Sequence, residues 1–482
     1  MDQKQRVGEP PVVGIHQRSP PLPPELVHQI LLEVKDNPKS QPNHCDSEPK
    51  DDTSESSDEE CGGSYGSTLD LLACSLVCND WYNEARPLLP AALNPILISD
   101  YQRYKTKELK RFAQLLAKSC RLHLYPWDAI TELTIINPKA LIDPRTAMYC
   151  DESAEAYKIV LRTAPNLRVL RIYYDAVSGR PECSDDTIQH LLRFFDSIIP
   201  LCGAITGLSL ELYEGKQGEG LFTFIPRLIE ALADHLPFLE INSSDLDDSM
   251  QAALRRCTGL HEIRILDSRL YRFAPILPFW PNLQRFRGSW YNMDVALMEE
   301  FLRTLAESCP RLNEVILSCT DDPSSSEGFN PGISPIAIRF ALRCPELRRL
   351  SVPCVRLDAG FVRELMQAQP QLERLHLNWC FELEARESLL EGLARPIWPE
   401  MRELLMESWY RAEIGFVERL VRECPRLELV AVPEIWESYK GFERVMRELG
   451  FDYTRVYNLG DDIWSSVIEW AWTRVETGGV AS

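Results

Sequence analysis

The sequence contains 482 residues, of which 45% are hydrophobic and 26% are charged, and its formal net charge is −20 at pH 7. A chain of this length and apolar content can bury a sizeable core, which excludes a protein that is disordered throughout. The acidic balance argues against nucleic acid or an anionic membrane as the partner, because such partners are bound by concentrated basic surfaces.

Residues 1–21 are polar and rich in proline, and we expect them to form a disordered tail. They lack the apolar run of a secretory signal, and no later apolar run is long enough to span a bilayer. The 15 cysteines are scattered without a CxxC pair, which favours reduced thiols over a zinc site. We therefore expect a protein of the cytoplasm or nucleus that holds no metal and no cofactor.

The segment "LPPELVHQILLEV" at residues 22–34 places Leu26, Ile30 and Val34 at the spacing of one helical face. Residues 36–66 differ in composition, and between positions 46 and 60 they contain eight acids and one lysine. Such a segment buries too little apolar surface to order itself, so it predicts a flexible loop. Ser56 and Ser57 stand at the spacing from acids that acidophilic kinases favour, but a solvated insertion is the simpler explanation.

The next segment, "STLDLLACSLVCNDWYNEARPLLP" at residues 67–90, is again apolar. Ser67 or Thr68 can cap a first helix, and Asn79 or Asp80 can cap a second, shorter one that ends before Pro87. Short apolar helices do not persist alone in water. We therefore expect the helices on either side of the acidic loop to pack against each other.

Residues 91–460 repeat the pattern apolar-x-x-apolar-x-apolar, at intervals of 23 to 38 residues. Helical patterns lie between the instances, as in "VALMEEFLRTLAESCP", "GFVRELMQAQP" and "GFVERLVRECP", and each of these ends at a proline. The instances begin at Leu93, Ile130, Leu167, Ile205, Leu236, Leu260, Leu283, Leu312, Leu347, Leu372, Met401 and Leu427, the one at Leu283 being imperfect because it ends in glycine.

A helix–strand unit cannot bury its own apolar face, so successive units stack with their strands side by side. The fold class predicted is therefore α/β, a right-handed solenoid with a parallel sheet on its concave side and helices outside. Cysteine recurs three residues before the first anchor of four units, which predicts small buried packing positions: Cys257, Cys309, Cys344 and Cys424.

Side chains alternate between the two faces of a strand, so the residue between the last two anchors of each unit should face the concave surface. Both charge signs occur in this predicted row, which implies no single charge class of ligand. The row contains Arg171, Ser209, Glu240, Arg264, Arg287, Ile316, Ser351, His376, Leu405 and Ala431.

Aromatic residues recur after these strands, six to nine residues past the first anchor. They would either line a rim that binds a partner, since Tyr and Trp are enriched at binding hot spots, or cover the core where strand passes to helix. The candidate substrate-binding residues are Tyr173, Tyr213, Trp290, Trp379, Trp409 and Trp436, with His376 from the concave row.

Residues 461–482 include Trp464, Val467, Ile468, Ala471 and Trp472 at helical spacing. A terminal unit of a solenoid must cover the open end of its core. We therefore expect a capping helix here, followed by a short tail.

Residues 22–90 resemble an F-box that the acidic loop interrupts. The opening Leu-Pro, the Ile-Leu of the first helix, the "SLVC" run and Trp81-Tyr82 follow one another in the order that the family shows. The repeats downstream resemble the irregular leucine-rich repeats that often follow an F-box, particularly in fungal proteins, although they lack the Asn or Cys consensus of regular repeats.

The resemblance implies a substrate-recognition subunit of a Skp–cullin–F-box type ubiquitin ligase, in which the repeats bind a protein substrate. The F-box would dock on a Skp-family adaptor and through it on a cullin, and some matching residues would form its core instead. A repeat scaffold without a role in ubiquitin transfer is the alternative. The implied adaptor-binding residues are Leu22, Pro23, Ile30, Leu31, Leu72, Ser75, Leu76, Val77, Cys78 and Trp81.

Enzymatic activity is not expected. The sequence lacks the phosphate-binding GxxxxGK[ST], the zinc-binding HExxH and a GxGxxG after a strand. The GxSxG match "GGSYG" at residues 62–66 follows an acidic loop, whereas a nucleophile elbow needs a buried strand before it.

Overall fold

The chain divides into two units, Met1–Ile130 and Thr131–Ser482. The computed structural model describes positions 114 and 117 and residues 130–137, 151–175, 185–213, 224–242, 246–266, 270–290, 295–319, 340–341, 343–353, 359–378, 390–393, 396–405, 414–431, 440–455 and 470–474. The predicted tail, acidic loop, F-box-like helices and first repeat at Leu93 therefore lie outside the described residues.

Within the described residues of the second unit, the sheet has 13 strands, and its first eleven strands follow one another in chain order. Each of these eleven pairs in parallel with its neighbours. They are β1 (Glu132–Asn137), β2 (Val169–Asp175), β3 (Gly207–Tyr213), β4 (Phe238–Asn242), β5 (Glu262–Leu266), β6 (Arg285–Trp290), β7 (Glu314–Cys319), β8 (Arg349–Pro353), β9 (Arg374–Asn378), β10 (Glu403–Leu405) and β11 (Leu429–Ala431).

The repeat pattern correctly predicts these strands. Each of its eleven instances from Ile130 onwards leads into one of β1–β11, and the described anchors are buried, as Leu170 and Ile172 of β2 show with exposures of 0% and 1%. This is the parallel-sheet solenoid of leucine-rich-repeat type that the pattern indicates.

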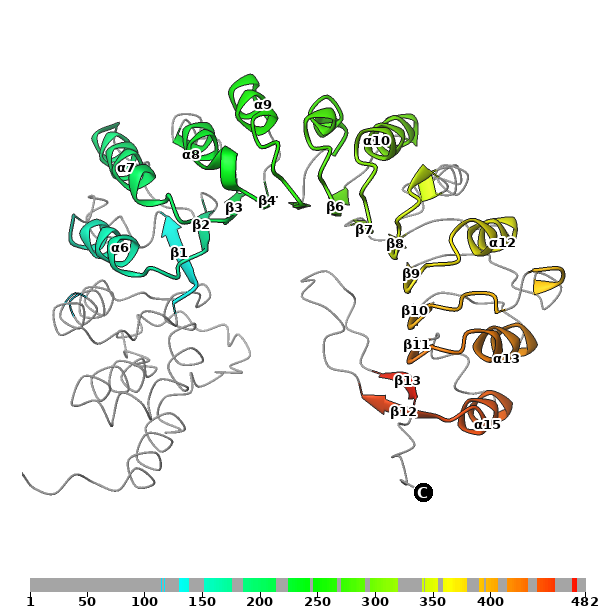
Figure 1. Ribbon diagram of the computed structural model, residues 1–482. Coiled ribbons are helices and arrows are strands. Elements are labelled where there is room, and N and C mark those ends of the chain that lie inside the picture. Colours follow the sequence, from blue (N-terminus) through cyan, green and yellow to red (C-terminus); the bar gives the residue numbers. More distant parts are fainter. Residues whose placement is uncertain are drawn as a thin grey trace, which may run out of the picture. The chain divides into compact units, whose positions relative to one another are not determined.

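The helices lie on one side of this sheet, and within the second unit the strands line the inner side of an arc (Figure 1). The apolar face of α10 (Val295–Ser308) is formed by Met298, Phe301, Leu302 and Leu305, whereas Leu297 is 38% exposed. The other α-helices with described bounds are α6 (Asp151–Thr163), α7 (Asp185–Ile198), α8 (Phe224–Leu232), α9 (Asp248–Arg255), α12 (Ala359–Ala368), α13 (Ile414–Glu423) and α15 (Lys440–Glu448).

The turn before most strands repeats the same backbone hydrogen bond. The N–H of the first anchor donates to the carbonyl three residues earlier, as from Ile205 to Cys202 at 2.9 Å and from Leu427 to Cys424 at 3.1 Å. The cysteines predicted to occupy this turn position are buried, and Cys202, which was not included in the prediction, occupies it as well. The prediction of small packing positions is therefore confirmed.

The connection between β5 and β6 contains two short 3₁₀-helices, Leu270–Phe273 and Leu277–Phe279, in place of an α-helix. Trp280 fills the turn position here and is fully buried. Its indole N–H donates to the carbonyl of Leu254 at 3.1 Å, so this side chain ties the unit to the preceding one.

The prediction of a C-terminal capping helix is wrong for the residues that the structure describes at this end. Trp470–Arg474 forms strand β13, which pairs antiparallel with β11 and with β12 (Phe451–Arg455). The open edge of β11 needs hydrogen-bond partners, and a strand supplies them where a helix could not. Trp472 is 3% exposed, and residues 456–469 lie outside the described part.

Candidate functional site

The concave face, which is the face of the sheet opposite the helices, carries a continuous row of side chains. Arg171 pairs in register with Ser209, Ser209 with Glu240, and Glu240 with Arg264. The register continues through every strand to Ala431 of β11. The ten residues predicted for the concave row therefore occupy one row of the sheet.

A second row lies two residues earlier on each strand, and charged side chains dominate it. Since side chains alternate along a strand, this row shares the concave face with the first. From β5 to β10 it contains Glu262, Arg285, Glu314, Arg349, Arg374 and Glu403.

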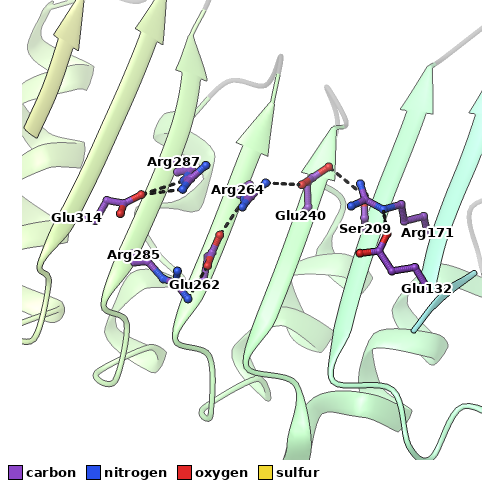
Figure 2. A network of polar contacts seen from close by, with 9 residues as sticks. All are labelled: Glu132, Arg171, Ser209, Glu240, Glu262, Arg264, Arg285, Arg287 and Glu314. Atoms are coloured by element: carbon purple, nitrogen blue, oxygen red, sulfur yellow. Dashed lines mark hydrogen bonds and ion pairs between the residues drawn. The ribbon is translucent and has the colours of Figure 1, made fainter. Parts of the chain in front are cut away.

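The two rows interact through a ladder of ion pairs across β4, β5 and β6 (Figure 2). Arg264 contacts Glu240 of the preceding strand at 3.6 Å and Glu262 of its own strand at 2.8 Å. Arg285 continues the ladder from β6 by contacting Glu262 at 2.9 Å, and Ser209 donates to Glu240 at 3.0 Å. Basic and acidic groups thus alternate over neighbouring strands.

A second set of contacts extends from β6 to β8. Arg287 contacts Glu314 at 2.9 Å, and Arg349 approaches the same carboxylate at 3.8 Å. At the far end of the row, Glu132 and Arg171 form a corresponding pair at 3.4 Å between β1 and β2 (Figure 2).

A third group lies on β9 and β10, where Arg374 contacts Glu403 at 3.3 Å. His376 is 8% exposed, and 3.7 Å separates its Nε2 from the nearest Glu403 carboxylate oxygen, which is too long for a hydrogen bond. Burial lowers the pKa of His376, and the charges of Arg349 and Arg374 act in the same direction, while the Glu403 carboxylate opposes them. The imidazole is therefore neutral at pH 7.

The described candidate substrate-binding residues do not align in a single row. Tyr173 pairs with Glu211 two positions beyond the concave row, whereas His376 belongs to that row itself. Tyr213 and Trp290 are the last residues of β3 and β6, four and three positions beyond the row. Trp379, Trp409 and Trp436 lie outside the described residues, as do all ten predicted adaptor-binding residues.

The ion-pair ladder was not predicted from the sequence, although a signal for it exists. In the motif of each unit, the residue just before the second anchor belongs to the second row, and it is charged in seven of the eleven units from Ile130 on. The sign alternates in part from unit to unit, as with Glu262, Arg285, Glu314 and Arg349. Reading this position across units would have indicated cross-strand pairs.

Within the part of the chain that the structure describes, no helix is long and apolar enough to cross a bilayer. The same residues contain no cluster of three or more His, Cys, Asp or Glu side chains that could hold a metal ion.

No protein-family model matches the sequence, and no curated protein matches it either. Among solved structures, the crystal structure of a TLR13–ssRNA13 complex is similar to this chain, with a TM-score of 0.35 and 14% sequence identity. The similarity covers 56% of this chain and 33% of that chain, so it spans about a third of the length of the solved structure. The repeated strand register and buried anchors identify the described residues of the second unit as a leucine-rich-repeat-like solenoid with a long, mostly parallel sheet.

Proposed function

We propose that this protein is the substrate-recognition subunit of a Skp–cullin–F-box type ubiquitin ligase. In this proposal residues 22–90 dock on a Skp-family adaptor, and the solenoid holds a protein substrate on its concave face. The first part is supported by the resemblance of residues 22–90 to an F-box.

The observation that carries the second part is the concave row, which places side chains from ten adjacent strands, β2 to β11, on one continuous face. Adjacent strands are about 4.8 Å apart, so ten of them extend over roughly 45 Å. A face of that length accommodates an extended segment of another protein better than a small molecule, which is usually enclosed in a pocket. Solenoids commonly bind partners in this way.

The adaptor interaction is tested by purifying the tagged full-length chain from cells and identifying the proteins that co-purify. Leu76→Asp places a charge in the implied contact and should abolish recovery of the adaptor. Leu297→Asp is the matched control, because it makes the same change at a side chain of α10 that is 38% exposed. Equal recovery of a Skp adaptor with both variants would refute the proposed docking segment.

The ubiquitin-ligase role is tested by the cullin in the same purification. Recovery of adaptor and cullin together supports a ligase subunit, whereas recovery of the adaptor alone contradicts that role and favours the scaffold.

The predicted contribution of the aromatic residues is tested separately. If Trp379→Ala and Trp409→Ala left both folding and substrate capture unchanged, these two residues would not bind the substrate.

A further inference from the structure

The ladder across β4–β6 has its two charge signs at different depths on the concave face. The side chains of Glu240 and Glu262 are 4% and 6% exposed. By contrast, the side chains of Arg264 and Arg285 are 22% and 49% exposed. The carboxylates therefore lie beneath the guanidinium groups, and an approaching partner meets the positive charges first.

Arg264 is held in place from several directions. Its Nε donates to Glu262 at 2.8 Å, its Nη1 lies 3.6 Å from Glu240, and its guanidinium carbon lies 5.2 Å from the centre of the Phe238 ring. A guanidinium group has five N–H donors, so these carboxylates orient the group without using all of its donors. Because the side chain is already ordered, binding a partner costs less conformational entropy here than at a free surface arginine.

The local charge balance differs from that of the whole chain. Over β4–β8 the two concave rows contain four arginines and three glutamates, an excess of one positive charge, whereas the formal net charge of the chain is −20. These residues are Glu240, Glu262, Arg264, Arg285, Arg287, Glu314 and Arg349.

Stability alone gives a poor account of this arrangement. Partly exposed ion pairs contribute little to stability, and removing a carboxylate from water costs energy that its partner only partly returns. Aliphatic residues fit the same row of the sheet without that cost, as Ile316 shows on β7. A ladder that presents oriented arginines over buried acids is better explained by recognition of a negatively charged partner.

We propose that Arg264 and Arg285 form a binding site for an acidic peptide segment of the partner protein, whose Asp and Glu carboxylates accept hydrogen bonds from the guanidinium groups. The planar fork of arginine matches the two oxygens of a carboxylate. This proposal rests on the assignment of partner binding to the concave face, and it is independent of adaptor docking.

The test measures binding of a fluorescein-labelled peptide of alternating Glu and Gly residues to the purified full-length protein by fluorescence anisotropy. Peptides with Gln or Lys in place of Glu serve as neutral and basic probes. We expect the acidic peptide to bind most tightly and to weaken as salt is raised from 50 to 300 mM, because salt screens exposed charges. Equal binding of the Gln peptide would overturn the proposal.

Two variants should change the affinity in opposite directions. Arg285→Gln should weaken binding of the acidic peptide about two- to fivefold, the range for one exposed ion pair, while Arg285→Lys should retain most of it. Glu262→Gln removes a buried negative charge beneath two arginines, while the amide oxygen of Gln can still accept the hydrogen bond from Arg264, so it should strengthen binding by a similar factor. A structural defect would not produce a gain, so loss or no change with Glu262→Gln refutes the site.

Arg343→Gln is the matched control. Arg343 is 47% exposed and contacts Glu307 at 2.9 Å, which closely matches the exposure and ion-pair distance of Arg285, but its partner Glu307 belongs to α10 and not to the sheet. It should leave peptide affinity unchanged, and an effect as large as that of Arg285→Gln would contradict a localised site.

Tighter binding of a single-stranded oligonucleotide than of the acidic peptide would contradict a peptide partner. Failure of adaptor recovery would leave these outcomes unaffected, so the two proposals fail separately.

Discussion

Gly288 occupies an anchor position of the repeat that Leu, Ile or Val fills in most other units, and restoring the repeat with leucine should destabilise the protein. A Cβ atom built on Gly288 would lie 2.8 Å from Cε1 of Phe286 and 3.0 Å from a methyl carbon of Leu270. The preceding anchor is a phenylalanine here, and its ring occupies the space that an aliphatic anchor uses elsewhere. The apparent imperfection is therefore compensated by its neighbour.

The change in the free energy of unfolding that Gly288→Leu causes follows from two opposing effects. Adding carbon atoms to a filled core costs about 1–3 kcal/mol, and replacing glycine within a strand returns roughly 0.5–1 kcal/mol of conformational entropy. We expect Gly288→Leu to lower the free energy of unfolding by about 1–2 kcal/mol as the balance of these effects. Adding Phe286→Leu to the Gly288→Leu variant should restore part of the lost stability, because the smaller side chain at position 286 leaves room for the new side chain at position 288.

The assay is urea unfolding of the full-length protein, followed by far-UV circular dichroism, for the wild type, both single variants and the double variant. Residues in contact typically show interaction energies of about 0.5–3 kcal/mol in such a cycle. Hydrogen exchange of the β6 amides supplies a local measurement, since unfolding of a repeat array need not be two-state. If Gly288→Leu raised stability, or if the two substitutions were additive, the steric explanation would be refuted.

Further predictions concern other buried side chains: a tryptophan, a histidine and five cysteines. Trp280→Phe should lower stability by about 1–3 kcal/mol in urea unfolding, because the Leu254 carbonyl loses its indole donor; no change would show that the hydrogen bond is dispensable. Burial lowers the pKa of His376, so its contribution to stability is present above its ordinary pKa of 6.5 and is lost as the pH falls below that value. His376→Gln should therefore flatten the decline in unfolding midpoint between about pH 7 and pH 5, and an unchanged slope would contradict this. Burial also raises the pKa of five cysteine thiols to about 12, so mass-spectrometric mapping at pH 8 should find them unmodified by iodoacetamide until the protein unfolds: Cys202, Cys257, Cys309, Cys344 and Cys424.

The strands could be predicted from sequence because each unit repeats the same local pattern. An apolar triplet such as Leu260, Ile263 and Ile265 fixes which residues are buried, and alternation then fixes the concave row without further information. Because each unit stacks only on the units before and after it in the chain, the order of the strands in the sheet follows the order of the repeats. The register from Arg171 to Ala431 follows from these two constraints.

The ends and the exceptions could not be predicted in the same way. Trp472 fits both the helical pattern that includes Ile468 and an alternating pattern with Trp470, and the unpaired edge of β11, which decides between them, is a property of the assembled sheet. Likewise, the strand pattern places Glu262 and Arg264 on the same concave face and predicts no difference in their exposure. Their difference in exposure arises only in the folded sheet, where Arg264 and Arg285 approach Glu240 and Glu262 across three strands.

The buried core and the proposed binding site share strand β6, which makes them separable by experiment. Phe286 and Gly288 face the helices, whereas Arg285 and Arg287 belong to the two concave rows. Repacking the core with Phe286→Leu and Gly288→Leu together preserves every concave charge, so it should leave acidic-peptide affinity unchanged even if stability shifts. Arg285→Gln should do the reverse, because a 49% exposed side chain contributes little to folding. If the core variant weakened peptide binding as much as the arginine variant did, the affinity would depend on the general order of the sheet rather than on the oriented guanidinium groups.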